Sequence, residues 1–166
     1  MLKKFVSVFL IIIMSVLFAS ANTIYLTQEE LSAYNGQNGQ PAYIAYQNFI
    51  YDVSGVFQNG TYNGLTAGTD ATLETSASDI VKNLQKIGTL VRSFTRAEVS
   101  VFDGKQGRRA YFIVDRLVYD ATNSPQWRFG SHGGVTAGQD GTAKIARSPH
   151  GLRVLQRLSV IGKVED

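Results

Sequence analysis

The only two histidines in the chain are the side chains best suited to bind a metal or a haem iron. His132 lies in a Gly-Ser-His-Gly-Gly run and His150 in a Ser-Pro-His-Gly run. Neutral imidazole is a common ligand of zinc, copper and iron. Adjacent turns of one helix would place both rings on the same face, whereas a separation of 18 residues lets two elements face each other. A two-histidine metal or haem site is therefore the leading hypothesis, and a turn histidine with a solvent-exposed one is the alternative.

The segment that carries the histidines has an earlier near-copy that lacks both. The aligned stretches are residues 26–53 with 94–121, and 57–72 with 127–142. Of these 44 aligned positions, 16 are identical. Two copies are too few for a solenoid, which needs about three repeats to share a core. The sequence therefore predicts two tandem small domains, at residues 22–91 and 92–166.

The start of the chain has the features of a signal peptide. Lys3 and Lys4 precede an uncharged run over residues 5–18, and Ala19-Ser20-Ala21 supplies the small residues of a cleavage site. We predict a signal peptide over residues 1–21 and a periplasmic or secreted protein. The alternative is an uncleaved membrane anchor, although this apolar stretch is shorter than the roughly 20 residues that span a bilayer.

The chain contains no cysteine, which narrows the chemistry of an exported protein. Disulfides, zinc-thiolate clusters and iron-sulfur clusters are excluded, and so is a Cys-x-x-Cys-His haem attachment site. Any haem must be held non-covalently, as haem b. Domains of about 70 residues bury little surface, so a bound cofactor or packing between domains would help to stabilise them.

Charge is divided unevenly between the two predicted domains. Residues 22–91 carry a net charge of −4, whereas residues 92–166 carry +5. The arginines are scattered rather than clustered in a basic run, so nucleic acid is not an expected partner. Some arginines of the second domain are candidates for docking an acidic redox partner, the alternative being solvated surface charge: Arg108, Arg109, Arg116 and Arg128.

Helix and strand signals follow the repeat. Thr27-Gln-Glu-Glu30 and Thr95-Arg-Ala-Glu98 match the capping box, so each begins a short helix, which we expect to end near Gly36 or Gly104. Two strand pairs with tight turns follow, rich in aromatic and branched residues. Their predicted ranges are 42–46 with 49–53, and 110–114 with 117–121.

The tail of the second domain predicts two further helices. Asp140 and Thr142 are suited to cap a helix over residues 143–147, and Ser148-Pro149 is typical of the start of another at His150. This last helix carries an apolar stripe at helical spacing, formed by Leu152, Leu155 and Leu158 with Val154 on its flank. The stripe is first of all a core feature, and it is also suited to line a pocket.

An ordered set of short motifs resembles the cytochrome b5-like haem/steroid-binding family, in its short bacterial form. The motifs are Thr-x-x-Glu, Gly-Gln-Asn-Gly-Gln-Pro-Ala-Tyr-Ile-Ala, Ile-Tyr-Asp-Val-Ser, Trp-x-x-Gly-x-His, Ala-Gly-Gln-Asp-x-Thr, Ser-Pro-His-Gly and Val-Ile-Gly. The resemblance implies an α+β fold, in which a short sheet supports helical hairpins around a haem, with His132 and His150 as axial ligands. The sequence reads His132-Gly-Gly134 where larger members of the family have His-Pro-Gly-Gly.

Two axial imidazoles leave no open position on the iron for oxygen or substrate. Electron transfer with a redox partner protein is then the expected role, with the protein tuning the potential. No Ser-His-Asp arrangement or clustered carboxylate motif argues for hydrolysis, so we do not expect an enzyme.

The first domain is expected to be degenerate. Tyr62 stands where His132 would be, and Ile80 falls near the place of His150, so a bis-histidine haem cannot form there. The surrounding residues resemble the membrane-associated progesterone receptor branch of the family, in which a tyrosine ligates haem from one side. The alternative is a turn tyrosine in a domain that keeps only its scaffold. A second hypothesis for the whole protein is a non-redox binding protein for a steroid-like or other apolar ligand, or a haem carrier.

Overall fold

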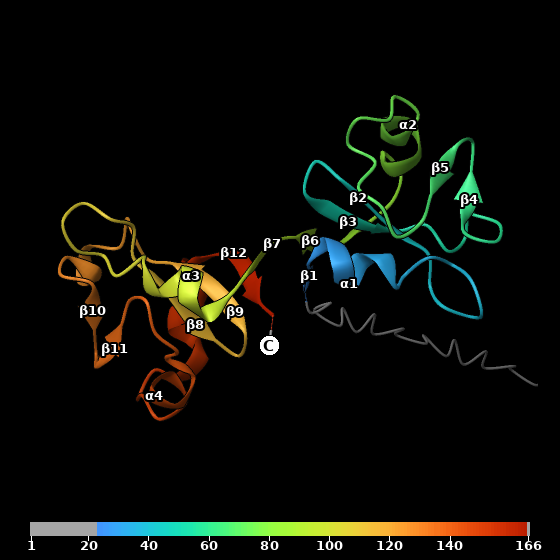
Figure 1. Ribbon diagram of the computed structural model, residues 1–166. Coiled ribbons are helices and arrows are strands. Elements are labelled where there is room, and N and C mark those ends of the chain that lie inside the picture. Colours follow the sequence, from blue (N-terminus) through green and yellow to red (C-terminus); the bar gives the residue numbers. More distant parts are fainter. Residues whose placement is uncertain (1–22, 166) are drawn as a thin grey trace, which may run out of the picture.

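The computed structural model describes residues 23–165, which form two lobes joined near the middle of the chain (Figure 1). The predicted signal peptide, residues 1–21, lies outside the described residues. Within residues 23–165, no helix is long and apolar enough to cross a membrane. Each lobe is built on a four-stranded sheet with short helices and a two-stranded hairpin beside it. The predicted α+β fold with two small units is confirmed.

The first unit comprises the described residues up to Val91. Its sheet has the order β1-β6-β3-β2, in which β6 is parallel to β1 and all other pairs are antiparallel. The strands of this sheet are β1 (Ile24–Leu26), β2 (Tyr43–Tyr46), β3 (Phe49–Asp52) and β6 (Lys86–Leu90). The remaining elements are α1 (Gln28–Ser32), the hairpin strands β4 (Thr61–Tyr62) and β5 (Leu65–Thr66), and α2 (Ala77–Val81).

The second unit, from Arg92 onward, repeats this topology. Its sheet has the order β7-β12-β9-β8, with β7 parallel to β12 and the other pairs antiparallel. The strands are β7 (Arg92–Phe94), β8 (Tyr111–Val114), β9 (Leu117–Asp120) and β12 (Ser159–Val164). The other elements are α3 (Arg96–Ser100), η1 (Pro125–Trp127), β10 (Ser131–His132), β11 (Val135–Thr136), α4 (Thr142–Ala146) and η2 (Gly151–Arg157). The near-copy in sequence is therefore also a copy in strand order and direction.

Both predicted capping boxes are present. The Thr27 N–H donates to Glu30 Oε2 at 3.0 Å, and the Glu30 N–H donates to Thr27 Oγ1 at 3.3 Å. Thr95 and Glu98 make the same two hydrogen bonds at the start of α3. The prediction that these helices run to Gly36 and Gly104 was wrong, since they end at Ser32 and Ser100. Gly36 and Gly104 lie about one helical turn beyond these helix ends. Glycine is required there because the backbone contacts another part of the chain.

The predicted strand pairs and their tight turns are confirmed, with each strand slightly shorter than expected. The central turn residues Gln47 and Asn48 have φ values of +50° and +66°, and Asp115 and Arg116 have +48° and +68°. Two consecutive positive φ values define a type I′ turn, whose twist matches that of the strands it joins. The Asp115 N–H also donates to Thr142 Oγ1 at 2.9 Å, which ties this turn to the start of α4.

The sheet of the second unit is covered on both faces, because alternate residues of β8 point in opposite directions and all four are buried. Phe112 and Val114 belong to a cluster with Trp127, Ile145 and Leu155, on the side of the η1, α4 and η2 segments. The other two β8 residues belong to a cluster that includes Val99 of α3. The loops that carry the histidines are thus attached to the first of these two clusters.

A single residue separates the two sheets. β6 ends at Leu90 and β7 begins at Arg92, with Val91 between them. Val91 is buried, and its N–H donates to the Leu26 carbonyl oxygen at 2.9 Å. A link this short, already tied to a strand of the first unit, restricts how far the units can move relative to each other.

An ion pair joins the units beside this link. Lys163 Nζ, from β12, donates to Glu30 Oε1, from the capping box of α1, and both side chains are less than one third exposed. Burial of the Glu30 carboxylate acts to raise its pKa, but the hydrogen bonds from Lys163 and from the Thr27 N–H outweigh this effect. The pKa of Glu30 is therefore lowered, and Glu30 serves both as a helix cap and as a contact between units.

We predict that Lys163→Met lowers the free energy of unfolding by about 1 kcal/mol or less at pH 7, as for other partly exposed ion pairs. Because the pKa of Glu30 is depressed in the folded protein, the stabilisation is present above its ordinary value of 4.5 and is lost as the pH falls through the folded value. Urea unfolding at pH 7 and pH 3 measures both effects. The difference between variant and wild type should shrink at pH 3.

Lys144→Met is the matched control, because the Lys144 side chain has no hydrogen bond or ion pair within the described residues. Equal losses from the two variants at pH 7, or a Lys163→Met effect that does not depend on pH, would contradict the role given to the Glu30–Lys163 pair.

Candidate functional site

His132 lies at the tip of the β10–β11 hairpin, with its side chain exposed. It is the cross-strand partner of Val135, which is buried. Between them, Gly133 and Gly134 have φ values of +56° and +82°, again a turn of type I′ geometry. The hairpin is therefore attached to the core through Val135, while the imidazole beside it remains accessible.

Close backbone contact fixes the base of this hairpin. Gly130 has a φ of +71°, and a Cβ atom on it would lie 1.9 Å from the Asp103 carbonyl oxygen. A Cβ atom on Gly104 would lie 2.7 Å from Gly130 Cα. Only glycine allows two backbones to approach so closely at a positive φ. These contacts hold the chain two residues before His132 and so set where the histidine lies.

Aromatic rings form the floor beside His132. Trp127 stacks on Phe112 with ring centroids 4.6 Å apart, and Phe112 stacks in turn on Tyr119. The Trp127 and His132 ring centroids are 6.4 Å apart. Trp127 is only 7% exposed and is therefore a core residue. The imidazole thus lies at the edge of an apolar, aromatic surface.

His150 comes from a different element, as the spacing suggested. It is the residue before η2, and its side chain is exposed. The predicted helix is present as a 3-10 helix over Gly151–Arg157, and only Leu155 of its apolar stripe is buried. Leu152 is 56% exposed, and Val154 is also exposed. The expectation that the stripe belongs to the core is therefore wrong for these two side chains, which extend the apolar surface next to His150.

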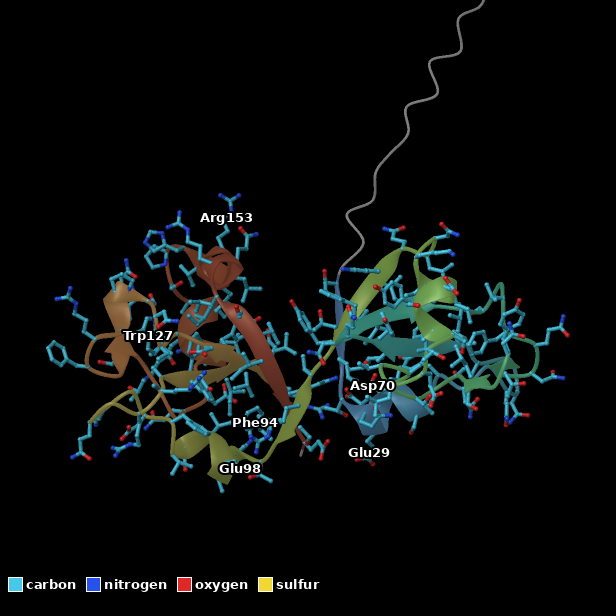
Figure 2. The ribbon with its side chains drawn as sticks, turned by 90° about the horizontal axis from the view of Figure 1, so that it is seen from above. Glu29, Asp70, Phe94, Glu98, Trp127 and Arg153 are labelled. Atoms are coloured by element: carbon cyan, nitrogen blue, oxygen red, sulfur yellow. The ribbon has the colours of Figure 1, made fainter. Side chains whose placement is uncertain are left out.

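The two histidine loops lie on the part of the second lobe away from the link. Figure 2 labels Trp127, five residues before His132, and Arg153, three residues after His150, and it shows Arg153 on the outside of that lobe. Among residues 23–165, no three His, Cys, Asp or Glu side chains gather to form a metal site. A porphyrin supplies four ligands to its iron, so two imidazoles are enough to complete the coordination of a haem.

The corresponding hairpin of the first unit carries Tyr62. This residue pairs with Leu65 as His132 pairs with Val135, and its ring stacks on Phe57 at a centroid distance of 6.1 Å. Tyr62 is 40% exposed and lies beside an open hollow of about 320 Å³. The residues that line this hollow are Val56, Tyr62, Asn63, Ser76, Asp79 and Ile80.

Two of the residues that line this hollow are equivalent, in the alignment of the two repeats, to the two histidines. Tyr62 stands for His132, and Ile80 falls near the place of His150. In the first unit, then, the hairpin tip and the segment that corresponds to the second histidine face one shared space. A larger cleft, of about 430 Å³, lies at the junction of the units and is lined by neither of these residues nor by a histidine.

No protein-family model matches the sequence, and no curated protein matches it. Solved structures do match. A cytochrome b5 domain protein of Methanococcoides burtonii is 36% identical, over 45% of this chain and 97% of its own, with a TM-score of 0.42. Another, from Hadesarchaea, is 39% identical, over 45% of this chain and 100% of its own, with a TM-score of 0.43. The chain belongs to the cytochrome b5 domain family.

The family assignment rests on the sequence identity and on the nearly complete coverage of both solved domains. It confirms the resemblance seen in the sequence at the level of the family. Each match has about the length of one unit, so the degenerate state of the first unit stays a prediction, and so does the short bacterial form.

The structure changes the set of arginines available for a partner of the cytochrome b5 domain. Arg108 makes a two-pronged contact with Asp103, through Nε and Nη2, which lowers the pKa of that carboxyl to about 2. Arg109 lies 3.5 Å from Asp120, and Arg116 Nε donates to the Val164 carbonyl oxygen. Of the four arginines proposed from the sequence, these three are engaged within the chain, which leaves Arg128.

Four further cations are better placed and were missed from the sequence. Their side chains are exposed, have no hydrogen bond or ion pair within residues 23–165, and lie on either side of His150: Lys144, Arg147, Arg153 and Arg157. One signal was present, since residues 141–164 contain no acidic residue at all. The loop of the second histidine is therefore basic.

We predict that Gly130→Ala destabilises the second unit by about 3 kcal/mol or more, because the methyl group would overlap the Asp103 carbonyl oxygen in left-handed backbone. Gly107→Ala is the control: its φ of +78° is similar, but nothing lies within 4 Å of the added atom. That change should cost only about 1 kcal/mol. Urea unfolding followed by the fluorescence of Trp127, the single tryptophan, reports on this unit. Equal losses would contradict the backbone contact.

Proposed function

We propose that the second unit binds one haem b through His132 and His150 and that the protein is an exported electron-transfer cytochrome. The observation that carries this proposal is the hollow of the first unit, where the two positions equivalent to the histidines face one shared space. Family membership supports a haem-binding role. Without cysteine, the haem would be held only by the axial ligands and by non-covalent contacts.

The side chains around the histidines fit a flat, mostly apolar ring. Trp127 lies beside His132, while the exposed Leu152 and Val154 follow His150. Covering such apolar surface is favourable by roughly 25 cal/mol per Å². In addition, Ser148 Oγ is buried without a hydrogen-bond partner in the described structure, two residues before His150. A polar edge group of a ligand or of a rearranged His150 loop would satisfy it.

With both axial positions filled, bound haem would supply one-electron redox chemistry and no open coordination site. The contribution of the chain is then structural and electrostatic. The Gly104–Gly130 contact positions His132, Trp127 supplies an apolar neighbour, and the basic loop around His150 attracts acidic partners. We therefore propose an acidic redox protein as partner, and we assign no enzymatic reaction.

We also propose that residues 1–21 direct export to the periplasm or beyond, with or without removal of the segment. N-terminal sequencing of the exported protein would give Asn22 as the first residue if the signal is cleaved. A first residue of Met1 on a membrane-bound protein would indicate that the segment is kept as an anchor.

We predict that the purified protein, loaded with haem, contains one haem per chain and has the sharp Soret band and resolved α and β bands of a reduced low-spin cytochrome. His132→Ala and His150→Ala should each abolish the low-spin spectrum, because each removes one axial ligand. Tyr62→Phe is the matched control and should leave the spectrum and the haem content unchanged. A chain that does not bind added haem, or a low-spin spectrum that survives either histidine change, would contradict the proposal.

A second candidate function is favoured by the hollow beside Tyr62, which is accessible and partly apolar. The first unit would then bind haem from one side through Tyr62, or bind a steroid-like or other apolar ligand. Haem analysis separates the cases. Two haems per chain, with one lost in Tyr62→Phe, would indicate a tyrosine-ligated haem in the first unit. One haem per chain with an unchanged Tyr62→Phe spectrum would exclude a tyrosine-ligated haem in the first unit.

A further inference from the structure

The loop before His132 exposes an aromatic side chain that the fold does not need. Phe129 is 83% exposed and lies next to Arg128, which has no hydrogen bond or ion pair within the described residues. The equivalent residues of the first unit are Gln58 and Asn59, so the shared scaffold forms without an aromatic or a cation here. A large apolar side chain left in water next to a charge is typical of a contact surface.

The first unit has a hollow of complementary character beside its β4–β5 hairpin. Val56, Tyr62 and Ile80 provide apolar wall, and Asp79 provides a carboxylate. Asp79 is paired only with Lys82, one turn along α2, and both side chains are more than half exposed. An exposed pair of this kind is worth less than about 1 kcal/mol, so Asp79 can exchange Lys82 for another cation at little cost.

The hollow cannot be filled by Phe129 of the same chain. Figure 1 shows the β10–β11 hairpin and the β4–β5 hairpin at opposite ends of the molecule. The one-residue link at Val91 and the Glu30–Lys163 pair restrict movement between the units. The partner that can fill the hollow must therefore come from another molecule.

We propose that a second copy of this chain fills the hollow, so that Phe129 packs between Val56 and Ile80 of the next molecule and Arg128 pairs with its Asp79. The opposite net charges of the units, −4 for residues 22–91 and +5 for residues 92–166, favour this head-to-tail contact. Because two different surfaces meet, each molecule keeps one of them free, and the contact extends into short linear assemblies. The contact uses the hollow of the first unit and not the histidines, so it does not depend on haem.

Sedimentation velocity of residues 22–166 tests this contact over a range of protein concentrations. We expect the mean sedimentation coefficient of the wild type to rise with concentration at low salt, and less so at 1 M salt, where charge attraction is screened within about 3 Å. Phe129→Ser removes the inserted ring, and Asp79→Lys places a cation opposite Arg128. Each variant alone should sediment as a monomer at every concentration.

A mixture of the two variants is the decisive measurement. The Asp79→Lys chain still presents Phe129 and Arg128, and the Phe129→Ser chain still presents an intact hollow. Their equimolar mixture should form dimers and nothing longer, which also shows that both variants are folded. Val101→Ser and Glu29→Lys are matched controls, because they change an exposed apolar side chain and an exposed carboxylate outside the contact. Both should associate like the wild type.

Three results would overturn the proposal: a wild type that stays monomeric, association that persists in both variants, or a mixture that stays monomeric. A monomeric wild type that instead co-sediments with vesicles of phosphatidylglycerol, and loses this binding in Phe129→Ser, would assign the exposed ring to a membrane surface.

Discussion

Direct contact between two stretches of backbone decides where the exposed hairpin of each unit lies. In the second unit the contact is made at Gly104 and Gly130, and the first unit repeats it at Gly36 and Gly60. All four glycines have a positive φ, and any larger residue at these points would meet backbone atoms or the Cβ of a neighbouring alanine. The hairpin tip follows two residues after the second glycine of each pair. Its location is therefore set by the backbone and does not depend on which side chain it carries.

This independence explains how two units with one scaffold can differ in chemistry. The positions that the two units share are those that build the scaffold: the capping boxes, the glycine contacts, and the Asp-x-Thr turns in which Thr72 or Thr142 accepts a hydrogen bond from a strand turn. The positions that differ are at the hairpin tip and in the segment opposite it. One unit has imidazoles and cations there, and the other has a phenol, an aliphatic side chain and carboxylates.

Much of the fold could be predicted because its signals are local. A capping box needs only residues three apart, and a tight turn needs only two residues between strands, so both were found from the sequence. The ends of α1 and α3 were misplaced because Gly36 and Gly104 serve a contact with residues about 25 positions away, which no local pattern reveals. The apolar stripe after His150 was assigned to the core for a similar reason. Periodicity shows that one face is apolar, but not whether another element covers it. The sequence did not show which charged side chains near the site are available to contact a partner protein. Arg108, for example, pairs with Asp103 only after the intervening loop has folded.

The parallel pairing of β1 with β6 and of β7 with β12 has a consequence for how the protein is made. In each unit the first strand meets the last, so a sheet closes only after nearly the whole unit is available, and such long-range pairing is slow to form. During synthesis the sheet of the first unit can form once β6 has been made. Val91 connects β6 directly to β7, so the start of β7 is then already held in place. The second unit must wait for β12, which enters between β7 and β9. β12 is therefore a central strand and not an edge, and deletion of its residues would remove the middle of the sheet.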